Sequence, residues 1–299
     1  MLHQGDRLWV GRFDCDPGHP RWSTDNAIGA WPLLAFPGTP VEIAQAGHRE
    51  VVATSNHVVL YNPGQIYRRR LVDPRGDHCV FVSVDGELLA ELGAVIDPAL
   101  EDRRDRPFTT ASRPVDPATV LAMSLLVRHL EPIAGPACEP MMVEESLLYV
   151  LAGVLARPDA PRPRGRPRDA ARRAELAQAL ERELAASFRE ARSLEELAAS
   201  VGASPFHATR VFRRHTGLTI HGYRHRLRLQ AVLERLADAR VDLTELALET
   251  GFSSHSHLTE AFRRAFGAPP SRLRGRIGRG QLRELSARLE RPGPDRARS

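Results

Sequence analysis

Arginine and histidine side chains recur at matched positions in two segments of the C-terminal third of the chain. Residues 194–217 read LEELAASVGASPFHATRVFRRHTG, and residues 243–267 read LTELALETGFSSHSHLTEAFRRAFG. In both, an apolar-periodic segment precedes a glycine, and a segment rich in Arg and His follows it. Guanidinium groups bind phosphates and guanine edges in a bidentate manner. Side chains of this kind, presented from helices, suit contact with a polyanion such as DNA.

Each copy also carries the signals that begin and end two short helices. In the first copy, Ser193 and Glu196 form a predicted capping box, Gly202 permits a left-handed turn, and Ser204-Pro205 begins the next helix. The second copy repeats this order with Asp242 to Glu245 as a capping box, Gly251 at the turn, and Ser253 or Ser254 as the next cap. We therefore predict two helix-turn-helix units in tandem, an arrangement that reads DNA.

Helical periodicity joins and precedes these units. Residues 220–238 predict one helix of roughly 28 Å at about 1.5 Å per residue, which is comparable with the roughly 34 Å between successive major grooves. A strut of this length sets two recognition helices into adjacent grooves if both face the same side. Residues 170–190 predict a further amphipathic helix before the first unit.

The N-terminal half follows a different pattern. Residues 39–84 contain short runs rich in β-branched and aromatic residues, separated by turn signals, and they predict a small sandwich or barrel. Two helices are expected next, one beginning near Asp116-Pro117 and one over 142–154. Their apolar surface packs within the chain or pairs with a second subunit, and the sequence leaves both open.

Length and charge support a division into two domains. Residues 1–156 hold 13 Arg and 20 acidic residues, whereas residues 157–299 hold 29 Arg and 17 acidic residues, so only the second half is strongly basic. The chain has no lysine, so every basic residue other than histidine is an arginine. Arginine suits bidentate contacts with guanine edges and phosphates, but a GC-rich genome produces the same bias. Its three scattered cysteines, and the lack of a long apolar run or signal peptide, predict a cytoplasmic protein.

The basic segment 157–168, RPDAPRPRGRPR, predicts an exposed linker. Its PRGRP core resembles an AT-hook, because extended Arg-Pro segments enter narrow minor grooves. A plain basic linker is the alternative. After residue 274 we expect a basic tail with one more helix, 281–289, and a disordered end.

Residues 170–274 resemble the DNA-binding domain of AraC/XylS-type transcription regulators. The resemblance rests on a run of ordered positions, with Leu273 standing where the family usually has Tyr: Ala247, Gly251-Phe252, His257-Leu258, Phe262-Arg263-Arg264, Phe266-Gly267, Pro270, Leu273-Arg274, and the first-unit run 210–217. More weakly, residues 1–156 resemble the family's cupin-like effector and dimerisation domain. The implied fold class is α+β: a cupin-like barrel or sandwich with a helical pair (1–156), a linker (157–169), an all-α DNA-binding domain of two helix-turn-helix units joined by a long helix (170–274) and a basic tail (275–299).

The resemblance implies roles for outward residues of the second helix in each unit. Base contacts fall on Phe206, Thr209 and Arg210, and on His255, Ser256, Thr259 and Glu260. Arg210 suits bidentate guanine readout, whereas Glu260 accepts from cytosine, repels phosphate or pairs with Arg264. Phosphate contacts fall on Arg213, Arg214, Arg263 and Arg264, which are otherwise a solvated face.

The resemblance further implies a bacterial homodimer that binds promoter DNA and a small-molecule effector, more often as an activator, with RNA polymerase as a further partner. Candidates to line the effector site are Trp9, Trp31, His48, Tyr67 and Phe81, each of which also fits an ordinary core or surface role. The effector, the operator and the direction of regulation are not encoded in any motif.

Other classes of function find less support in the residues. A metal-dependent cupin enzyme needs an HxH pair in its strands, and the only HxH, His255-Ser-His257, lies in a predicted recognition helix. His221 and His225 at i, i+4 lack a third ligand. Cys79 suits a redox sensor or an ordinary buried thiol, and the basic segments suit an architectural DNA binder. We therefore predict no catalytic residue, no metal and no cofactor.

Overall fold

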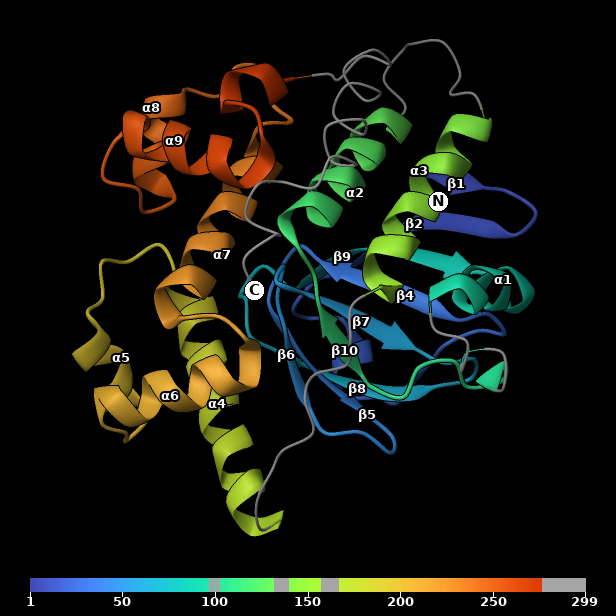
Figure 1. Cartoon of the computed structure of the whole chain (residues 1–299), viewed down its shortest axis with the longest axis horizontal. Coiled ribbons are helices and arrows are strands. Elements are labelled where there is room, and N and C mark those ends of the chain that lie inside the picture. The colour runs from blue at the N-terminus through green and yellow to red at the C-terminus, as the bar shows by residue number, and fades with distance from the viewer. Residues whose placement is uncertain (97–99, 101–102, 132–139, 157–166, 276–299) are drawn as a thin grey trace. The chain divides into compact units, whose positions relative to one another are not determined.

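The computed structural model describes residues 1–96, 100, 103–131, 140–156 and 167–275, and it has an α+β architecture (Figure 1). The chain divides into two compact units, each made of two segments. Unit 1 comprises Met1–Val115 and Leu151–Arg228, and unit 2 comprises Asp116–Val150 and Leu229–Ser299. The segments of each unit alternate along the chain, so the units do not follow the sequential order of the expected domains.

The strands of unit 1 form two antiparallel sheets. Six strands pair in the order β1-β2-β9-β4-β7-β10, and four pair in the order β3-β8-β5-β6. The strands are β1 (His3–Gln4), β2 (Leu8–Cys15), β3 (Asn26–Ala27), β4 (Leu33–Pro37), β5 (Val41–Gln45), β6 (Val51–Ala53), β7 (His57–Tyr61), β8 (Ile66–Leu71), β9 (Asp77–Val84) and β10 (Ser112–Pro114).

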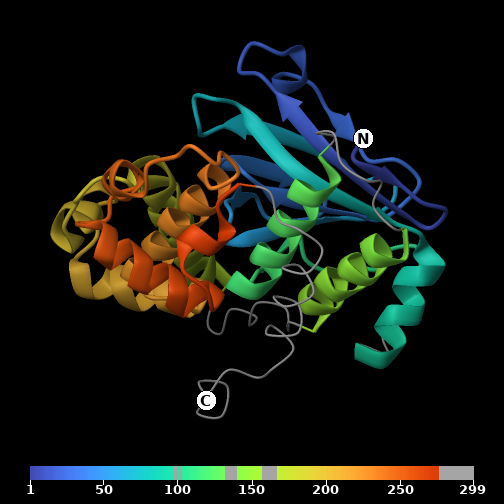
Figure 2. The same ribbon diagram turned by 90° about the horizontal axis from the view of Figure 1, so that it is seen from above.

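The core of these sheets comes from alternating strand residues. β2 and β9 pair over eight residues, from Leu8 opposite Val84 to Cys15 opposite Asp77, and run as long neighbours in Figure 2. Side chains at every second position point to one face, so β-branched and aliphatic residues such as Val10, Leu34 and Val82 are completely buried. The predicted sandwich or barrel takes the form of two separate sheets, and the described strands do not close into one barrel.

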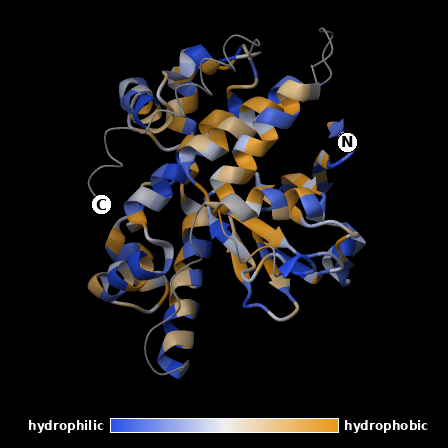
Figure 3. Ribbon diagram, turned by 45° about the vertical axis from the view of Figure 1, so that its right-hand side comes forward, coloured by the Kyte–Doolittle hydropathy of each residue, from blue (hydrophilic) through white to orange (hydrophobic). Residues whose placement is uncertain are grey.

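The described helices follow the sequence patterns closely. In Figure 3, hydrophobic residues are concentrated on α2, α3 and the strands. The bounds are α1 (Gly86–Ile96), α2 (Pro117–Leu130), α3 (Pro140–Leu155), α4 (Pro167–Ser187), α5 (Leu194–Ser200), α6 (Pro205–Thr216), α7 (Ile220–Arg235), α8 (Leu243–Glu249) and α9 (His255–Phe266).

Some helix boundaries and one cap differ from the sequence predictions. α4 begins at Pro167, so the last residues of the expected linker are helical. α7 ends at Arg235, which gives about 24 Å at 1.5 Å per residue, because residues 236–240 leave the helix in turns. Asp242 caps α8 by accepting from Thr244 and Glu245 N–H groups, a simpler cap than the predicted reciprocal box. Residues 157–166, with most of the PRGRP segment, and residues 276–299 lie outside the described residues.

The first helix-turn-helix copy belongs to unit 1 with the sheets. A buried polar cluster joins β6–β7 to α4 and α7: Thr54 Oγ1 lies 2.8 Å from Tyr223 Oη, and Asn56 Nδ2 donates to the Tyr223 carbonyl at 3.3 Å. In the same cluster, His57 Nε2 lies 3.5 Å from Glu181 Oε1, and the two side chains are 13% and 4% exposed. Burial raises the pKa of Glu181 to about 8 and lowers that of His57 to about 4. Both groups are therefore neutral at pH 7.

The second helix-turn-helix copy belongs to unit 2 and shares its core with α2. Leu121 and Leu125 of α2 pack in one cluster with Val232, Leu246 and Phe262. From the end of α2, Arg128 Nη2 donates to the carbonyl oxygens of Leu236 and Leu273 at 3.1 and 2.7 Å. The sequence left open whether the apolar face of this helix packs within the chain, and for α2 it does.

The structure also bears on membrane insertion. Of the helices in the described ranges, none is long and apolar enough to cross a bilayer.

Candidate nucleic-acid interface

α6 is the second helix of the first unit, and its local sequence fixes both of its ends. Ser204 caps it by accepting from the His207 N–H, Pro205 takes the first turn, and Gly217 ends it in the left-handed conformation at φ 74°. Between α5 and α6, Gly202 has φ 66°, as the predicted turn requires. The predicted capping box at Ser193 and Glu196 is present in α5.

The two faces of α6 have opposite character. Ala208, Val211 and Phe212 are buried, and the Phe212 ring meets Tyr223 edge-on at 5.2 Å. The opposite face presents Phe206, which is 76% exposed, together with exposed Arg210, Arg213 and Arg214. The Arg210 guanidinium lies 5.7 Å from the Phe206 ring centroid, within cation–π range. The helix thus offers an aromatic side chain and a guanidinium together near its N-terminus.

α9 has the same design in the second unit. Ser254, one of the two predicted caps, accepts from the His257 N–H, whereas the Ser253 hydroxyl lies 3.0 Å from His257 Nδ1. Leu258, Ala261, Phe262 and Phe266 form the buried face. The outer residues are those expected from the sequence, with Thr259 half-buried: His255, Ser256, Thr259, Glu260, Arg263 and Arg264.

The charges on α9 are already paired within the helix. Glu260 Oε2 accepts from Arg263 at 2.9 Å, and Glu260 Oε1 accepts from Arg264 at 3.1 Å. The hydrogen bond from Arg263 is the main reason that the pKa of Glu260 is lowered. The i+4 partner anticipated from the sequence is present, and a second arginine joins it. One carboxylate therefore holds both of the α9 arginines that are expected to reach phosphates.

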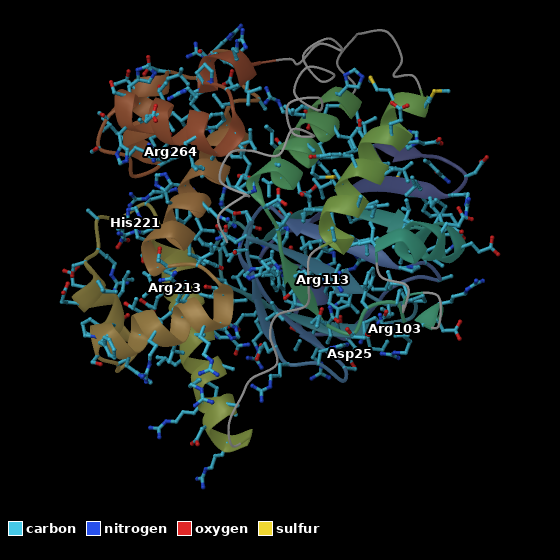
Figure 4. All side chains as sticks on the ribbon, in the orientation of Figure 1. Asp25, Arg103, Arg113, Arg213, His221 and Arg264 are labelled. Atoms are coloured by element: carbon cyan, nitrogen blue, oxygen red, sulfur yellow. The ribbon has the colours of Figure 1, made fainter. Side chains whose placement is uncertain are left out.

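α6 differs from α9 in this respect. Over the residues that the structure describes, no carboxylate pairs with Arg210, Arg213 or Arg214, whereas α9 carries Glu260 among its arginines. Arg213 and Arg264 are labelled on the two helices in Figure 4. Each side chain expected to contact DNA on α6 is thus at least partly exposed and carries no intrahelical acidic partner.

A second candidate site lies between the two sheets of unit 1. A cavity of about 110 Å³ is lined by residues of both sheets. Two of the five residues expected at an effector site, Tyr67 and Phe81, line it. The other three expected residues do not line the cavity. Trp9 and Trp31 pack on each other with ring centroids 4.9 Å apart, and His48 lies in the turn that follows β5.

Sequence reasoning missed the polar residues of this cavity. Arg69 and Asp77 line it, and Arg69 Nη1 donates to Asp77 Oδ2 at 2.9 Å. The signal was present in the run Arg68-Arg69-Arg70 of β8: strand alternation with inward Tyr67 places Arg69 inward and leaves Arg68 and Arg70 exposed.

The residues considered for metal or redox chemistry are also placed. The rings of His221 and His225 stack with centroids 5.8 Å apart, and within the described part of the chain no group of three or more His, Cys, Asp or Glu side chains could hold a metal ion. Cys79 lines the cavity between the sheets, and burial raises the pKa of its thiol. A raised pKa disfavours the reactive thiolate that a redox sensor needs.

Comparison with known proteins gives matches in the C-terminal region. A family model described as a helix-turn-helix domain matches residues 197–276. The transcriptional regulator GlxA of Rhizobium meliloti is 37% identical over 82 residues, which cover 27% of this chain and 25% of GlxA. The multiple antibiotic resistance protein MarA of Escherichia coli is 29% identical over 93 residues, which cover 31% of this chain and 73% of MarA.

Solved structures include similar chains. A probable AraC family transcriptional regulator from Rhodopseudomonas palustris is 26% identical, with a TM-score of 0.31, and the match covers 37% of this chain and 97% of that one. The aligned region spans only a quarter of GlxA. The region matched by the family model, residues 197–276, contains α6, α7, α8 and α9 and most of α5. It therefore covers both candidate recognition helices.

Proposed function

Since residues 197–276 form a helix-turn-helix domain of the AraC type, we propose that the chain is a sequence-specific DNA-binding transcription regulator. The observation that supports it best is the pair of capped helices α6 and α9, each with a buried apolar face and an outer face of polar and basic side chains. A helix of this design enters the major groove with its N-terminal residues against base edges. The arginine excess of the second half supplies the electrostatic attraction to phosphates.

The proposed base-reading residues occupy the outer face near the start of each helix: Phe206, Thr209 and Arg210 on α6, and His255, Ser256, Thr259 and Glu260 on α9. Arg210 reads guanine through two N–H groups, and Phe206 meets a thymine methyl. Arg213, Arg214, Arg263 and Arg264 contact phosphates. Because α6 has an arginine at a base-reading position, whereas α9 offers His, Ser, Thr and Glu there, the first unit gives the sharper readout in this proposal.

The finer features of the regulator belong to the same proposal. The N-terminal region acts as a cupin-like effector and dimerisation domain, and effector binding there makes the protein an activator of promoters in the bacterial cytoplasm, with RNA polymerase as a further partner. The cavity lined by Tyr67 and Phe81 is the candidate effector site. The relatives matched here are named as regulators or resistance proteins, which supports a role without catalysis.

The experiment compares two arginines of α6 by selecting binding sites from random duplex DNA with the full chain. Arg210→Ala should relax the preference at one base position and cost about 1–3 kcal/mol on the selected site. Arg214→Ala should weaken binding to all sequences alike and reduce the slope of log K against log salt by about 1. An unchanged base preference in Arg210→Ala would contradict the assignment of Arg210, and failure to select any consensus would contradict the proposed function.

A further inference from the structure

Tyr223 of α7 lies between the first recognition helix and the sheets of unit 1. Its side chain is 1% exposed. One side of the ring meets Phe212, a fully buried residue of α6, edge-on with centroids 5.2 Å apart. The hydroxyl lies 2.8 Å from Thr54 Oγ1, in the turn that joins β6 to β7. A single side chain therefore contacts both the buried face of α6 and a turn of the sheets.

The turn that receives Tyr223 is anchored in both sheets. It runs from β6 of the four-stranded sheet to β7 of the six-stranded sheet, so its two ends are held by different strands. Thr54 Oγ1 accepts from the Asn56 N–H at 3.3 Å, and Asn56 Nδ2 donates to the Tyr223 carbonyl at 3.3 Å. Both side chains of the turn are buried. The turn thus holds the side chain and the backbone of Tyr223 together.

Further contacts hold the two helices next to α6 against the same sheets. Arg226 of α7 donates through Nη1 to the carbonyl of Val115 at 3.3 Å, and Arg182 of α4 pairs with Glu42 of β5. α6 itself packs on α4 and on the ring of Tyr223. The sheets therefore support the first recognition helix through its neighbouring helices.

The position of α6 matters because base readout tolerates little displacement. Binding groups must be held within about 0.5 Å of their productive geometry. Arg210 and Phe212 belong to one helix, so a shift of Phe212 on Tyr223 moves Arg210 as well. In the second unit, Phe262 packs on Phe266 at 4.5 Å within an apolar cluster of unit 2. A change in the turn of unit 1 should therefore reach α6 and not α9.

We propose that Thr54 and Tyr223 are positioning residues for DNA recognition. The contact between their hydroxyls sets the position of α6, so the sheets of the N-terminal region control how the first unit reads bases. Both side chains are buried, and neither touches DNA in this proposal. The role rests on the regulator proposed above, because it is a role in reading DNA, but the anchoring of α6 can be measured without DNA.

Thr54→Val and Tyr223→Phe each remove one hydroxyl and keep the shape of the side chain. The full chain selects sites from random duplex DNA, and Arg210→Ala and His255→Ala mark the base positions that α6 and α9 read. At the α6 position, each hydroxyl variant should lower the preference for the selected base by about threefold or more, with the α9 positions unchanged. Unchanged preference at the α6 position, or an equal loss at both sets of positions, overturns the proposal.

Two further variants separate positioning from a loss of stability. Thr39, in the loop between β4 and β5, is buried, accepts from the His78 N–H at 2.8 Å and donates to the Gly76 carbonyl at 2.7 Å. Thr39→Val should therefore lower the urea midpoint of unfolding without changing base preference. The double variant Thr54→Val/Tyr223→Phe removes both hydroxyls, so it should be no less stable than Thr54→Val while its loss of preference persists. A loss of preference in Thr39→Val equal to that in Thr54→Val, or restored preference in the double variant, overturns the proposal.

Amide hydrogen exchange of the free chain, followed by mass spectrometry, tests the anchoring without DNA. Thr54→Val should speed exchange in α6 about threefold more than Thr39→Val does, and α9 should exchange alike in both. Equal exchange of α6 in the two variants overturns the proposal, even for a chain that selects no site. Faster exchange of α6 in a chain that selects no DNA site refutes the regulator and leaves the anchoring of α6 by Thr54 standing. Site selection with unchanged α6 readout in both hydroxyl variants refutes the positioning role alone.

Discussion

The buried carboxyl group of Glu181 makes the stability of unit 1 depend on pH. It lies in the polar cluster between α4 and strands β6–β7, and burial raises its pKa from 4.5 to about 8. A raised pKa means that the folded chain holds this proton more tightly than the unfolded chain. The contribution to stability is therefore complete below pH 4.5 and is lost as the pH rises through 8. The shift of about 3.5 units corresponds to about 5 kcal/mol over the whole range.

We predict the outcome for Glu181→Gln, which replaces the neutral carboxyl by a neutral group of the same shape. Between pH 6.5 and pH 9, wild type should lose about 2 kcal/mol more than the variant, by linkage from pKa values of 8 and 4.5. Changes from His57 and other groups cancel in this difference. For a urea slope of about 2 kcal/mol per molar, the relative shift in midpoint is roughly 1 M.

Urea unfolding followed by tryptophan fluorescence is the suitable assay. All three tryptophans, Trp9, Trp22 and Trp31, lie in unit 1, so the signal reports on the unit that contains Glu181. Glu175→Gln, an exposed glutamate on the same helix, is the matched control and should behave like wild type. An equal pH-dependent loss in wild type and Glu181→Gln, or the same effect in Glu175→Gln, would refute the reasoning.

Further predictions concern the same cluster and the interface. Burial lowers the pKa of His57 from 6.5 to about 4, so the unfolded chain takes up this proton before the folded chain does. Unit 1 should therefore lose up to about 3 kcal/mol of unfolding free energy as the pH falls from 6.5 to 4. In an acid titration, His57→Asn should lack this loss. Glu260→Gln should free Arg263 and Arg264, and duplex titrations should show tighter non-specific binding with a salt slope steeper by about 1 to 2; an unchanged slope would contradict that role. Gly202→Ala should destabilise the chain by about 1 kcal/mol, as measured by thermal unfolding followed by circular dichroism. Gly202 has φ 66°, and no atom lies within 4 Å of the added Cβ, so the loss comes from backbone strain alone. Deleting residues 162–168 tests minor-groove reading: a larger affinity loss on A-T-flanked than on G-C-flanked sites supports it, and equal losses leave a basic linker.

The local architecture of the interface was encoded in sequence. Ser193, Ser204 and Gly202 act through neighbours within four residues, and the caps and the left-handed turn predicted from them are present. The caps and turn glycines that begin α6 and α9 are local in the same sense, so both helices were predicted from the sequence. The ends of α7 and α4 differ from the predicted ones, because fraying and turns at helix termini depend on contacts beyond the segment.

The contacts in the interior of unit 1 could not be predicted from local sequence signals. The partner of Arg69, Asp77, is eight residues away on another sheet, and the partners Thr54 and Tyr223 are 169 residues apart. Alternation in a strand indicates which side chains share a face, but not which opposing sheet covers that face or whether it leaves a cavity. Likewise, the apolar face of α2 was evident from its periodicity, whereas its packing with Phe262 was decided by the tertiary fold. Sequence by itself therefore determined the helix-turn-helix units, whose signals are local, and only the tertiary structure determined the buried ion pair, the polar cluster and the cavity, whose residues meet through long-range packing.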